Sequence, residues 1–151
     1  MYLLHQSNLI IKARIYKKFG VLEQMKIIKV VAAILQKEDK ILIARKKQGK
    51  PLAGYFEFPG GKIEEGETPE ESLIRELMEE MNIKIAVKEY IGESIYDYGN
   101  DKVISLLGYT AEIIDGEIKL SDHDRYEWVT LEQINNYKIA PADIPLINKL
   151  K

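Results

Sequence analysis

Apolar and polar positions change their spacing along the chain, and this change predicts which segments form strands and which form helices. Continuous apolar, β-branched runs predict strands over 27–35 and 40–44, joined by a polar turn at 36–39. Over 68–81 the apolar positions instead recur every three or four residues, which predicts a helix with one apolar stripe. The stripe is formed by Ile74, Leu77, Met78 and Met81.

The sequence carries recognisable signals for both the start and the end of this predicted helix. Thr68 is a suitable N-cap, Pro69 suits the first helical turn, and Glu71 completes a capping box three residues after Thr68. Asn82 follows the last apolar position, where a residue that tolerates left-handed backbone is needed. We therefore expect the helix to begin at Thr68 and to end at Asn82.

The remaining elements are short and mixed in type. Apolar runs bounded by turn residues predict further strands over 55–58, 83–91, 103–114 and 126–129. Short helices are expected over 131–136 and 141–150. Strands and helices do not alternate regularly, so an α+β layered domain is favoured over a doubly wound one.

Composition limits the classes of function. The chain has 151 residues, 46% of them hydrophobic, which suits one compact domain. Its formal charge of -2 argues against broad nucleic-acid binding, and the absence of cysteine excludes disulfide scaffolds and thiolate metal sites. No run of 18 apolar residues is present, so we expect no membrane partner and a cytoplasmic location.

The first 24 residues stand apart from the rest. Their apolar stretch is interrupted by polar and basic residues, and no small-residue cleavage site follows, so a signal peptide is not expected. Residues 1–24 are either a simple extension, with Met25 as the natural start, or an added element used in self-association. The predicted domain is 25–151, as a monomer or a homodimer.

Eight glutamates lie between residues 64 and 80, with Arg75 as the only base among them. A solvated helix face explains most acidic runs. Here, however, Glu76, Glu79 and Glu80 are spaced so that their carboxylates fall on one helix face without counter-charges. Such a group becomes favourable when a hard divalent cation such as Mg²⁺ lies among the oxygens.

The residues around these glutamates resemble the Nudix box. Gly61 is followed after five residues by Glu67, and after seven more by Arg75, which opens the sequence Arg-Glu-Leu-Met-Glu-Glu-Met-Asn-Ile. Only the final glycine of the signature differs, being replaced by Asn82. The resemblance implies a Nudix hydrolase, with a mixed sheet between helices in an α/β/α sandwich.

The same resemblance implies roles for the residues of the box. Glu76, Glu79 and Glu80 would bind Mg²⁺, or Mn²⁺ as a substitute, together with a backbone carbonyl of Gly60 or Gly61. Arg75 and Glu67 would hold each other and orient the helix. Either Glu76 or Glu80 would serve as the base that removes a proton from the attacking water.

Outside the box, residues 55–62 and 140–146 resemble segments of MutT-type nucleoside triphosphate pyrophosphohydrolases. Asp122 would supply a further carboxylate, whereas His123 beside it is expected to be a polar loop residue. Asp143 would hydrogen-bond the base of the nucleotide, or simply begin the last helix. Four more residues are candidates for substrate binding: Phe58, by stacking on the base or as part of the core, and Arg45, Lys46 and Lys62, by contacting the triphosphate.

The expected function is Mg²⁺-dependent hydrolysis of nucleoside triphosphates to a nucleoside monophosphate and pyrophosphate, with oxidised nucleotides such as 8-oxo-dGTP as substrates. Pyrimidine nucleotides such as CTP or 5-methyl-dCTP, ADP-ribose and dinucleoside polyphosphates are alternatives. ADP-ribose is disfavoured because its subgroup typically carries a proline after the box, and none occurs between Pro69 and Pro141. A non-catalytic binding module is a further alternative, although such modules usually lose the box glutamates.

Overall fold

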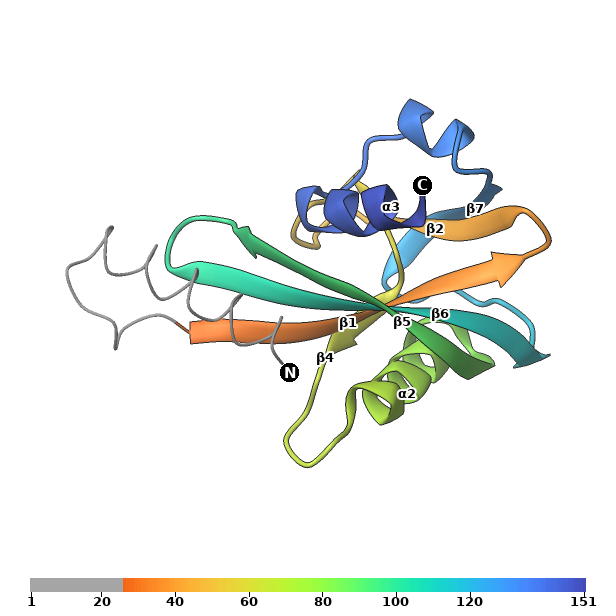
Figure 1. Ribbon diagram of the computed structural model, residues 1–151, viewed down its shortest axis with the longest axis horizontal. Helices are drawn as coiled ribbons and strands as arrows, with labels where there is room; N and C mark the ends of the chain where they lie inside the picture. Colours follow the sequence, from red (N-terminus) through yellow and green to blue (C-terminus); the bar gives the residue numbers. More distant parts are fainter. Residues whose placement is uncertain (1–25) are drawn as a thin grey trace.

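The computed structural model of the chain describes residues 26–151, so the expectations for residues 1–24 lie outside the described part. Seven strands form one sheet in the order β3-β2-β1-β6-β5, with β4 paired to β1 and β7 paired to β2 (Figure 1). The strands are β1 (Lys26–Lys37), β2 (Lys40–Lys46), β3 (Phe56–Glu57), β4 (Gly60–Lys62), β5 (Ile83–Asp97), β6 (Lys102–Gly116) and β7 (His123–Val129). The helices are α2 (Pro69–Met81), η1 (Gln133–Asn136), η2 (Pro141–Asp143) and α3 (Ile144–Leu150).

β1 is the strand that joins the two halves of the sheet. It pairs with β6 in parallel over ten residues, whereas it pairs with β2 only at Gln36 and Lys37, beside the hairpin turn. Beyond that point β2 diverges toward β3 and β7, and β4 pairs with β1 at Val30, Val31 and Ala32 in the space that this leaves. The divergence opens the sheet beside β4, which is where the candidate site lies.

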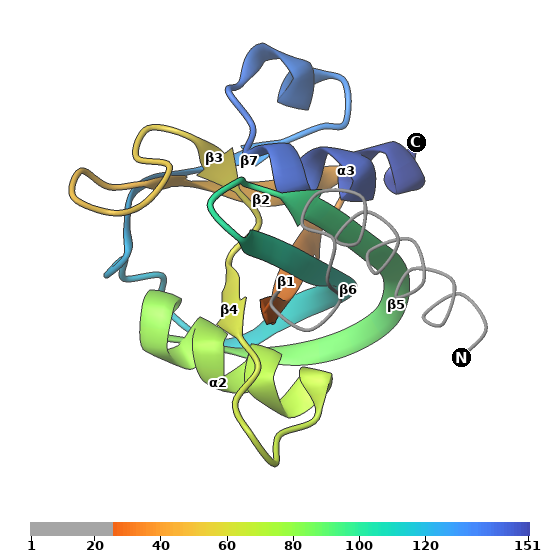
Figure 2. The same ribbon diagram turned by 90° about the vertical axis from the view of Figure 1, so that its left-hand side faces the viewer.

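The two longer helices cover opposite faces of the sheet (Figures 1 and 2). Alternate residues of β1 point to opposite faces, because successive side chains of a strand do so. Val31 and Leu35 pack in the cluster that contains Leu77 of α2, whereas Ile34 packs in the cluster that contains Leu146 of α3. The predicted α+β sandwich of a mixed sheet between helices is therefore confirmed.

α2 begins and ends where its sequence predicts. The Thr68 hydroxyl accepts a hydrogen bond from the Glu71 N–H at 3.1 Å, and Pro69 opens the helix. Asn82 adopts left-handed backbone, with φ 59° and ψ 32°, and its N–H donates to the Met78 carbonyl at 3.0 Å. Asparagine can therefore take the place of the final glycine of the box without disturbing the helix end.

Several boundaries differ from the sequence expectation. The expected final helix is divided into η2 and α3, and the expected helix over 131–136 is a single 3₁₀ turn. β5 continues beyond Ile91 to Asp97, because backbone pairing with β6 persists through irregularities near Tyr90 and Gly92 that break the apolar pattern. β4 was not expected at all, since Gly60 and Gly61 carry no strand signal. None of the described helices has the length and apolarity needed to cross a membrane.

Candidate active site

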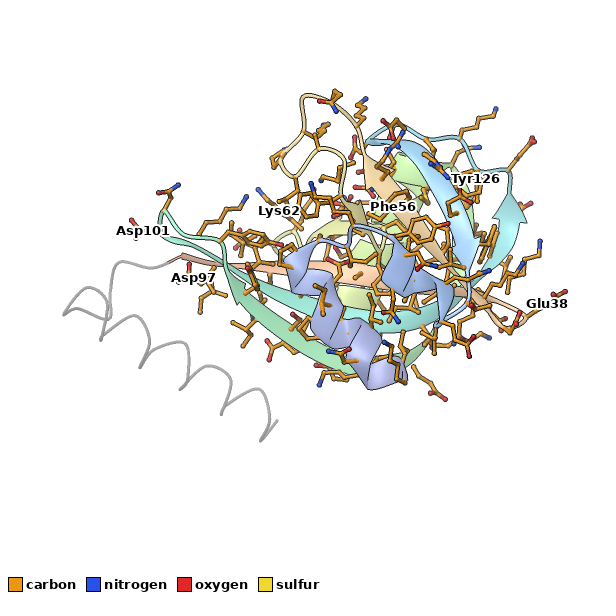
Figure 3. The ribbon with its side chains drawn as sticks, turned by 90° about the horizontal axis from the view of Figure 1, so that it is seen from above. Glu38, Phe56, Lys62, Asp97, Asp101 and Tyr126 are labelled. Atoms are coloured by element: carbon orange, nitrogen blue, oxygen red, sulfur yellow. The ribbon has the colours of Figure 1, made fainter. Side chains whose placement is uncertain are left out.

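A cavity of about 460 Å³ lies where the sheet opens beside β4. β4 and Glu80 of α2 form one end of the cavity, and η2, which leads into α3, forms the other end. Its lining includes Lys46, Glu57, Phe58, Gly60, Gly61, Lys62, Glu80, Tyr98, Ala140, Ala142 and Asp143. Lys62 lies centrally between the two ends of the sheet, which Asp101 and Glu38 mark in Figure 3.

Arg75 is the centre of the charged network at the α2 end. Its guanidinium donates to both carboxylate oxygens of Glu67, at 2.7 and 2.9 Å, which is the bidentate geometry that favours strong pairing. It also donates to Glu76 at 2.9 Å and to Glu79 at 3.2 Å. The hydrogen bonds from Arg75 lower the pKa of Glu67 to about 2. Glu76 and Glu79 therefore share a counter-charge, which corrects the expectation that they lack one.

The carboxylate of Glu76 lies directly against Gly61. A Cβ atom added to Gly61 would lie 2.3 Å from the Glu76 carboxyl carbon, and one added to Gly60 would lie 1.8 Å from the Val31 carbonyl oxygen. Both distances are far below van der Waals contact. At Gly60 the obstacle is backbone, so that position requires glycine, whereas at Gly61 a side chain would displace the Glu76 carboxylate. Burial of Glu76 raises its pKa, although Arg75 opposes this effect.

Glu80 faces the cavity from the last turn of α2. Its Oε2 atom is buried and has no hydrogen-bond partner. Desolvation raises the pKa of Glu80 to about 9, and the neighbouring charges of Glu76, Glu57 and Asp122 add to this effect. A carboxylate in this environment is stabilised by any positive charge that enters the cavity.

Asp122, which precedes β7, belongs to the same acidic group. Its carboxylate raises the pKa values of Glu76 and Glu80, so the structure brings Asp122 to the α2 end of the cavity. The resemblance to MutT-type enzymes outside the box implies a further carboxylate from this residue. The Lys50 ammonium lies 3.6 Å from Asp122 Oδ1. Glu79 lies at the exposed edge of this group: its side chain is 60% exposed and contacts Arg75, and its charge also acts on Glu76.

These residues fit a divalent cation in their chemistry. Glu76, Glu80 and Asp122 supply oxygen ligands of the kind that Mg²⁺ prefers, and the unpartnered Oε2 of Glu80 is a ligand atom without a competing bond. Within residues 26–151, no three acidic or histidine side chains are already grouped as a finished metal centre. Arg75 instead holds Glu76 and Glu79, so a cation would compete with its guanidinium for those two carboxylates.

Asp143 occupies the opposite end of the cavity. Backbone hydrogen bonds attach the segment before it to β3: Phe56 donates to the Lys138 carbonyl at 2.7 Å, and Ala140 donates to the Phe56 carbonyl at 2.9 Å. These bonds bring the buried carboxylate of Asp143 to the Phe58 N–H, which donates to Oδ2 at 2.8 Å. Burial raises the pKa of Asp143 well above its usual value, and the charge of Glu57 adds to this effect. The second oxygen, Oδ1, has no protein partner among the described residues.

Two aromatic residues line the cavity near Asp143. Phe58 is 3% exposed and packs in the cluster beneath α3, so it both lines the cavity and belongs to the core. Tyr98 follows β5, and its hydroxyl accepts a hydrogen bond from the Ala142 N–H at 3.3 Å. Desolvation raises the pKa of Tyr98 to about 12. The walls at this end are therefore mostly apolar, with a few fixed polar groups, as in small-molecule sites generally.

Of the three residues predicted to contact the triphosphate, Lys46 and Lys62 line the cavity, whereas Arg45 does not. Successive residues of β2 face opposite sides, so Arg45 points away from the cavity and pairs with Asp124 at 2.7 Å. Its neighbour Lys46 points toward the cavity and lies 3.7 Å from the Glu57 carboxylate. Lys46 is therefore better placed than Arg45 to meet an anionic ligand.

Sequence reasoning did not single out Glu57 as a site residue and treated His123 as part of a loop. His123 instead begins β7 and is 3% exposed, and its Nε2 atom lies 2.9 Å from Glu57 Oε2. Glu57 lies inside the aromatic segment 55–58, where strand alternation alone could have predicted that it faces away from Phe56 and Phe58. The contact with His123 had no sequence signal.

Comparison with known proteins identifies the family. Residues 25–150 match the model of the NUDIX domain. The chain is 37% identical over 123 residues to the CTP pyrophosphohydrolase of Escherichia coli, covering 82% of this chain and 90% of that protein. It is 35% identical over 128 residues to the 8-oxo-dGTP diphosphatase of E. coli, covering 84% and 98%. The solution structure of the E. coli ORF135 protein superposes with a TM-score of 0.74 at 36% identity, covering 87% of this chain and 93% of that one.

Proposed function

Because the chain belongs to the Nudix family and is a pyrophosphohydrolase, we propose that it hydrolyses nucleoside triphosphates to a nucleoside monophosphate and pyrophosphate in a Mg²⁺-dependent reaction. Nudix enzymes act on small-molecule nucleotides and generally need a divalent metal. The observation that carries the finer proposal is the cavity with Glu80 at one end and Asp143 at the other. The charged α2 end would suit the triphosphate of a nucleotide, and the mostly apolar Asp143 end would suit its base.

The α2 end suits the triphosphate. Glu76, Glu80 and Asp122 would hold Mg²⁺, with Glu79 as a further ligand once it leaves Arg75 and with a backbone carbonyl of Gly60 or Gly61. When bound, the cation neutralises phosphate charge and makes water more acidic. Lys46 and Lys62 place ammonium groups along the same cavity, where they would attract the phosphates.

The protein itself supplies the proton acceptor. Glu80 is the better candidate for the general base, because it lines the cavity and its Oε2 atom has no hydrogen-bond partner that would compete for a proton. Glu76 is held by Arg75 and lies against Gly61, which suits a fixed ligand better than a proton carrier. Arg75 and Glu67 would keep α2 in the orientation that both glutamates need.

The Asp143 end suits the base. Oδ2 already accepts from the Phe58 N–H, and the raised pKa of Asp143 favours a neutral carboxyl group that both donates and accepts. An edge with one donor and one acceptor side by side complements such a group. The N7–H and O6 edge of 8-oxoguanine has this pattern, and we propose oxidised nucleotides such as 8-oxo-dGTP as substrates.

A pyrimidine substrate is the second candidate, and the same carboxyl group favours it. The N4 amino group and N3 of cytosine also form a donor–acceptor pair. CTP and 5-methyl-dCTP therefore belong beside 8-oxo-dGTP in any test.

The experiment is a pyrophosphate-release assay with 8-oxo-dGTP, dGTP, CTP, 5-methyl-dCTP and ADP-ribose, each with Mg²⁺, with Mn²⁺ and with a chelator. The proposal predicts release that requires metal and favours one of the triphosphates. Glu71→Gln is the matched control for any glutamate variant of α2, because Glu71 is exposed at the far end of the same helix. Metal-independent turnover, or ADP-ribose as the best substrate, would overturn the proposal.

A further inference from the structure

His123 reaches Glu57 across an intervening strand. β2 lies between β3, which carries Glu57, and β7, which carries His123. The imidazole Nε2 atom nevertheless lies 2.9 Å from Glu57 Oε2, and the histidine side chain is only 1% exposed. The residue lies behind Glu57 as seen from the cavity, because Glu57 lines the cavity and His123 does not.

An irregularity in β7 makes this contact possible. Arg45 of β2 pairs with Arg125, but the next residue, Lys46, pairs with His123 instead of Asp124. Asp124 is thus an extra residue in β7, and such a bulge reverses the face on which the preceding side chain points. It leaves Asp124 beside Arg45 and places His123 on the same face as Lys46 and Glu57. Without the bulge, His123 would point away from Glu57.

The surroundings of the His123 imidazole indicate which ring nitrogen carries the hydrogen. Nδ1 is buried and has no hydrogen-bond partner. A buried N–H without an acceptor is more costly than a ring nitrogen that carries only a lone pair. In the neutral ring the hydrogen therefore lies on Nε2, which donates to Glu57 Oε2, and Nδ1 is unprotonated.

This hydrogen bond leaves one side of the Glu57 carboxylate available to the cavity. Oε2 receives the His123 hydrogen bond and lies 3.7 Å from the Lys46 ammonium. Oε1 has no protein partner within the part of the chain that the structure describes. The charge of Glu57 acts on both Glu80 and Asp143, so the carboxylate lies between the two ends of the cavity.

We propose that His123 is a positioning residue for nucleotide binding: its Nε2–H holds Glu57 so that the free carboxylate oxygen faces the bound nucleotide. The proposal rests on the proposed function, since it assumes that the cavity binds the nucleotide. It assigns to His123 no contact with substrate or metal and no proton transfer. Its effect therefore passes entirely through Glu57 and appears in substrate binding.

The test is a double-mutant cycle of His123→Leu and Glu57→Ala, measured as KM and kcat for the preferred nucleotide. His123→Leu is expected to raise KM about tenfold, as expected for loss of a hydrogen bond to a charged group, with kcat changed less than about twofold. In the Glu57→Ala background the same substitution should add less than about twofold. His123→Gln keeps an N–H donor near the Nε2 position and should restore most of the affinity. Equal effects of His123→Leu with and without Glu57 would overturn the proposal.

A spectroscopic measurement separates this proposal from the proposed function and does not require His123→Leu to fold. The chain contains only His5 and His123, so a protein labelled with ¹⁵N in histidine gives two sets of ring signals, and His5→Gln removes one. The neutral His123 ring should show the Nε2–H form, with its signal shifted by Glu57→Ala. Glu127→Gln is the control, because Glu127 lies in the same strand and pairs with Arg125. A His123 signal in the Nδ1–H form, or one unchanged by Glu57→Ala, contradicts the proposal whether or not nucleotides are hydrolysed.

Discussion

The Asp143 carboxylate accepts the backbone N–H of Phe58 at 2.8 Å, although 85 positions separate the two residues in the chain. The bond joins the strand that precedes the Nudix box to the segment that precedes the last helix. It fixes one oxygen of Asp143 and leaves the other for a ligand. In the proposed function, selection of the base would therefore depend on a carboxyl group whose position is set by the fold itself.

Asp143→Ala is expected to change the ranking of nucleotides. The preferred substrate should lose about 1–3 kcal/mol in kcat/KM, because a hydrogen bond to its base disappears, while poor substrates lose less. Mg²⁺ dependence should remain. The measurement is kcat/KM for each nucleotide in the wild type and in the variant. An equal loss for every nucleotide would show that Asp143 only maintains the backbone around Phe58.

Arg75→Ala is expected to lower both activity and stability. The substitution removes the bidentate partner of Glu67 and the shared counter-charge of Glu76 and Glu79, and changes of this kind typically cost about 10–100-fold in activity. Arg125→Ala is the control, since it breaks an exposed ion pair in β7. The assay measures kcat/KM and Tm together. If Arg75→Ala matched the control in both quantities, the network would be ordinary surface charge.

The ion pair between Glu67 and Arg75 predicts that the protein loses stability at low pH. The pKa of Glu67 is about 2 in the folded protein, below its ordinary value of 4.5. Its ion pair therefore stabilises the fold fully above about pH 4.5. This contribution is lost as the pH falls from about 4.5 toward 2. The difference in Tm between the wild type and Arg75→Ala should therefore narrow over this range. A constant difference down to pH 2 would contradict the role of the ionised pair.

The raised pKa of Glu80 predicts that the metal-free protein loses stability as the pH rises, which is opposite to the effect of Glu67. The folded pKa of Glu80, about 9, exceeds the unfolded value, so burial of the neutral carboxyl favours the fold at low pH, and this contribution is lost as the pH rises from about 4.5 to 9. Glu80→Gln should flatten the decline, and Mg²⁺ should raise Tm more in the wild type than in the variant. The measurement is thermal unfolding across this range with and without Mg²⁺. Identical pH profiles for the two proteins would contradict this prediction.

Gly60 and Gly61 should respond differently to alanine. At Gly61 the new methyl group meets the end of the Glu76 side chain, which can move, so activity should fall by up to about 100-fold with little change in Tm. At Gly60 it meets the backbone of Val31, which cannot move easily, so stability should fall by about 1–3 kcal/mol. Activity and Tm are measured for both variants. A larger loss of stability at Gly61 than at Gly60 would contradict this assignment.

Much of the fold was predictable because local signals agree with it. Thr68, Glu71 and Asn82 determine both ends of α2, and the apolar runs that form β1 and β2 are long enough to be recognised. β4 and the continuation of β5 were not predictable, because backbone pairing with β1 and β6 determines them rather than side-chain pattern. The division of the final helix into η2 and α3 likewise depends on how residues 138–140 attach to β3.

The site was predictable only where its residues are close in sequence. The resemblance to the Nudix box implied that Glu67 and Arg75 would hold each other, and the two side chains do form hydrogen bonds. It did not indicate that Glu79 would turn to Arg75 while Glu80 became buried beside Asp122, since helix spacing gives the face but not the neighbours. Which of Arg45 and Lys46 faces the cavity depends on strand register, and the contact between His123 and Glu57 depends on one bulge in β7. The sequence indicates Arg45 and Lys46 as candidates but does not reveal this arrangement.

The most direct test of the central claim is ³¹P NMR of the products formed from the best triphosphate, comparing the wild type with Glu80→Gln and Glu79→Gln in the presence of Mg²⁺. The account predicts a nucleoside monophosphate and pyrophosphate from the wild type and no product with a chelator. It predicts a fall of about 10³-fold in rate for Glu80→Gln with the fold retained, because a metal ligand or the base is lost. Formation of a nucleoside diphosphate and phosphate, or full activity in a folded protein carrying both substitutions, would contradict it.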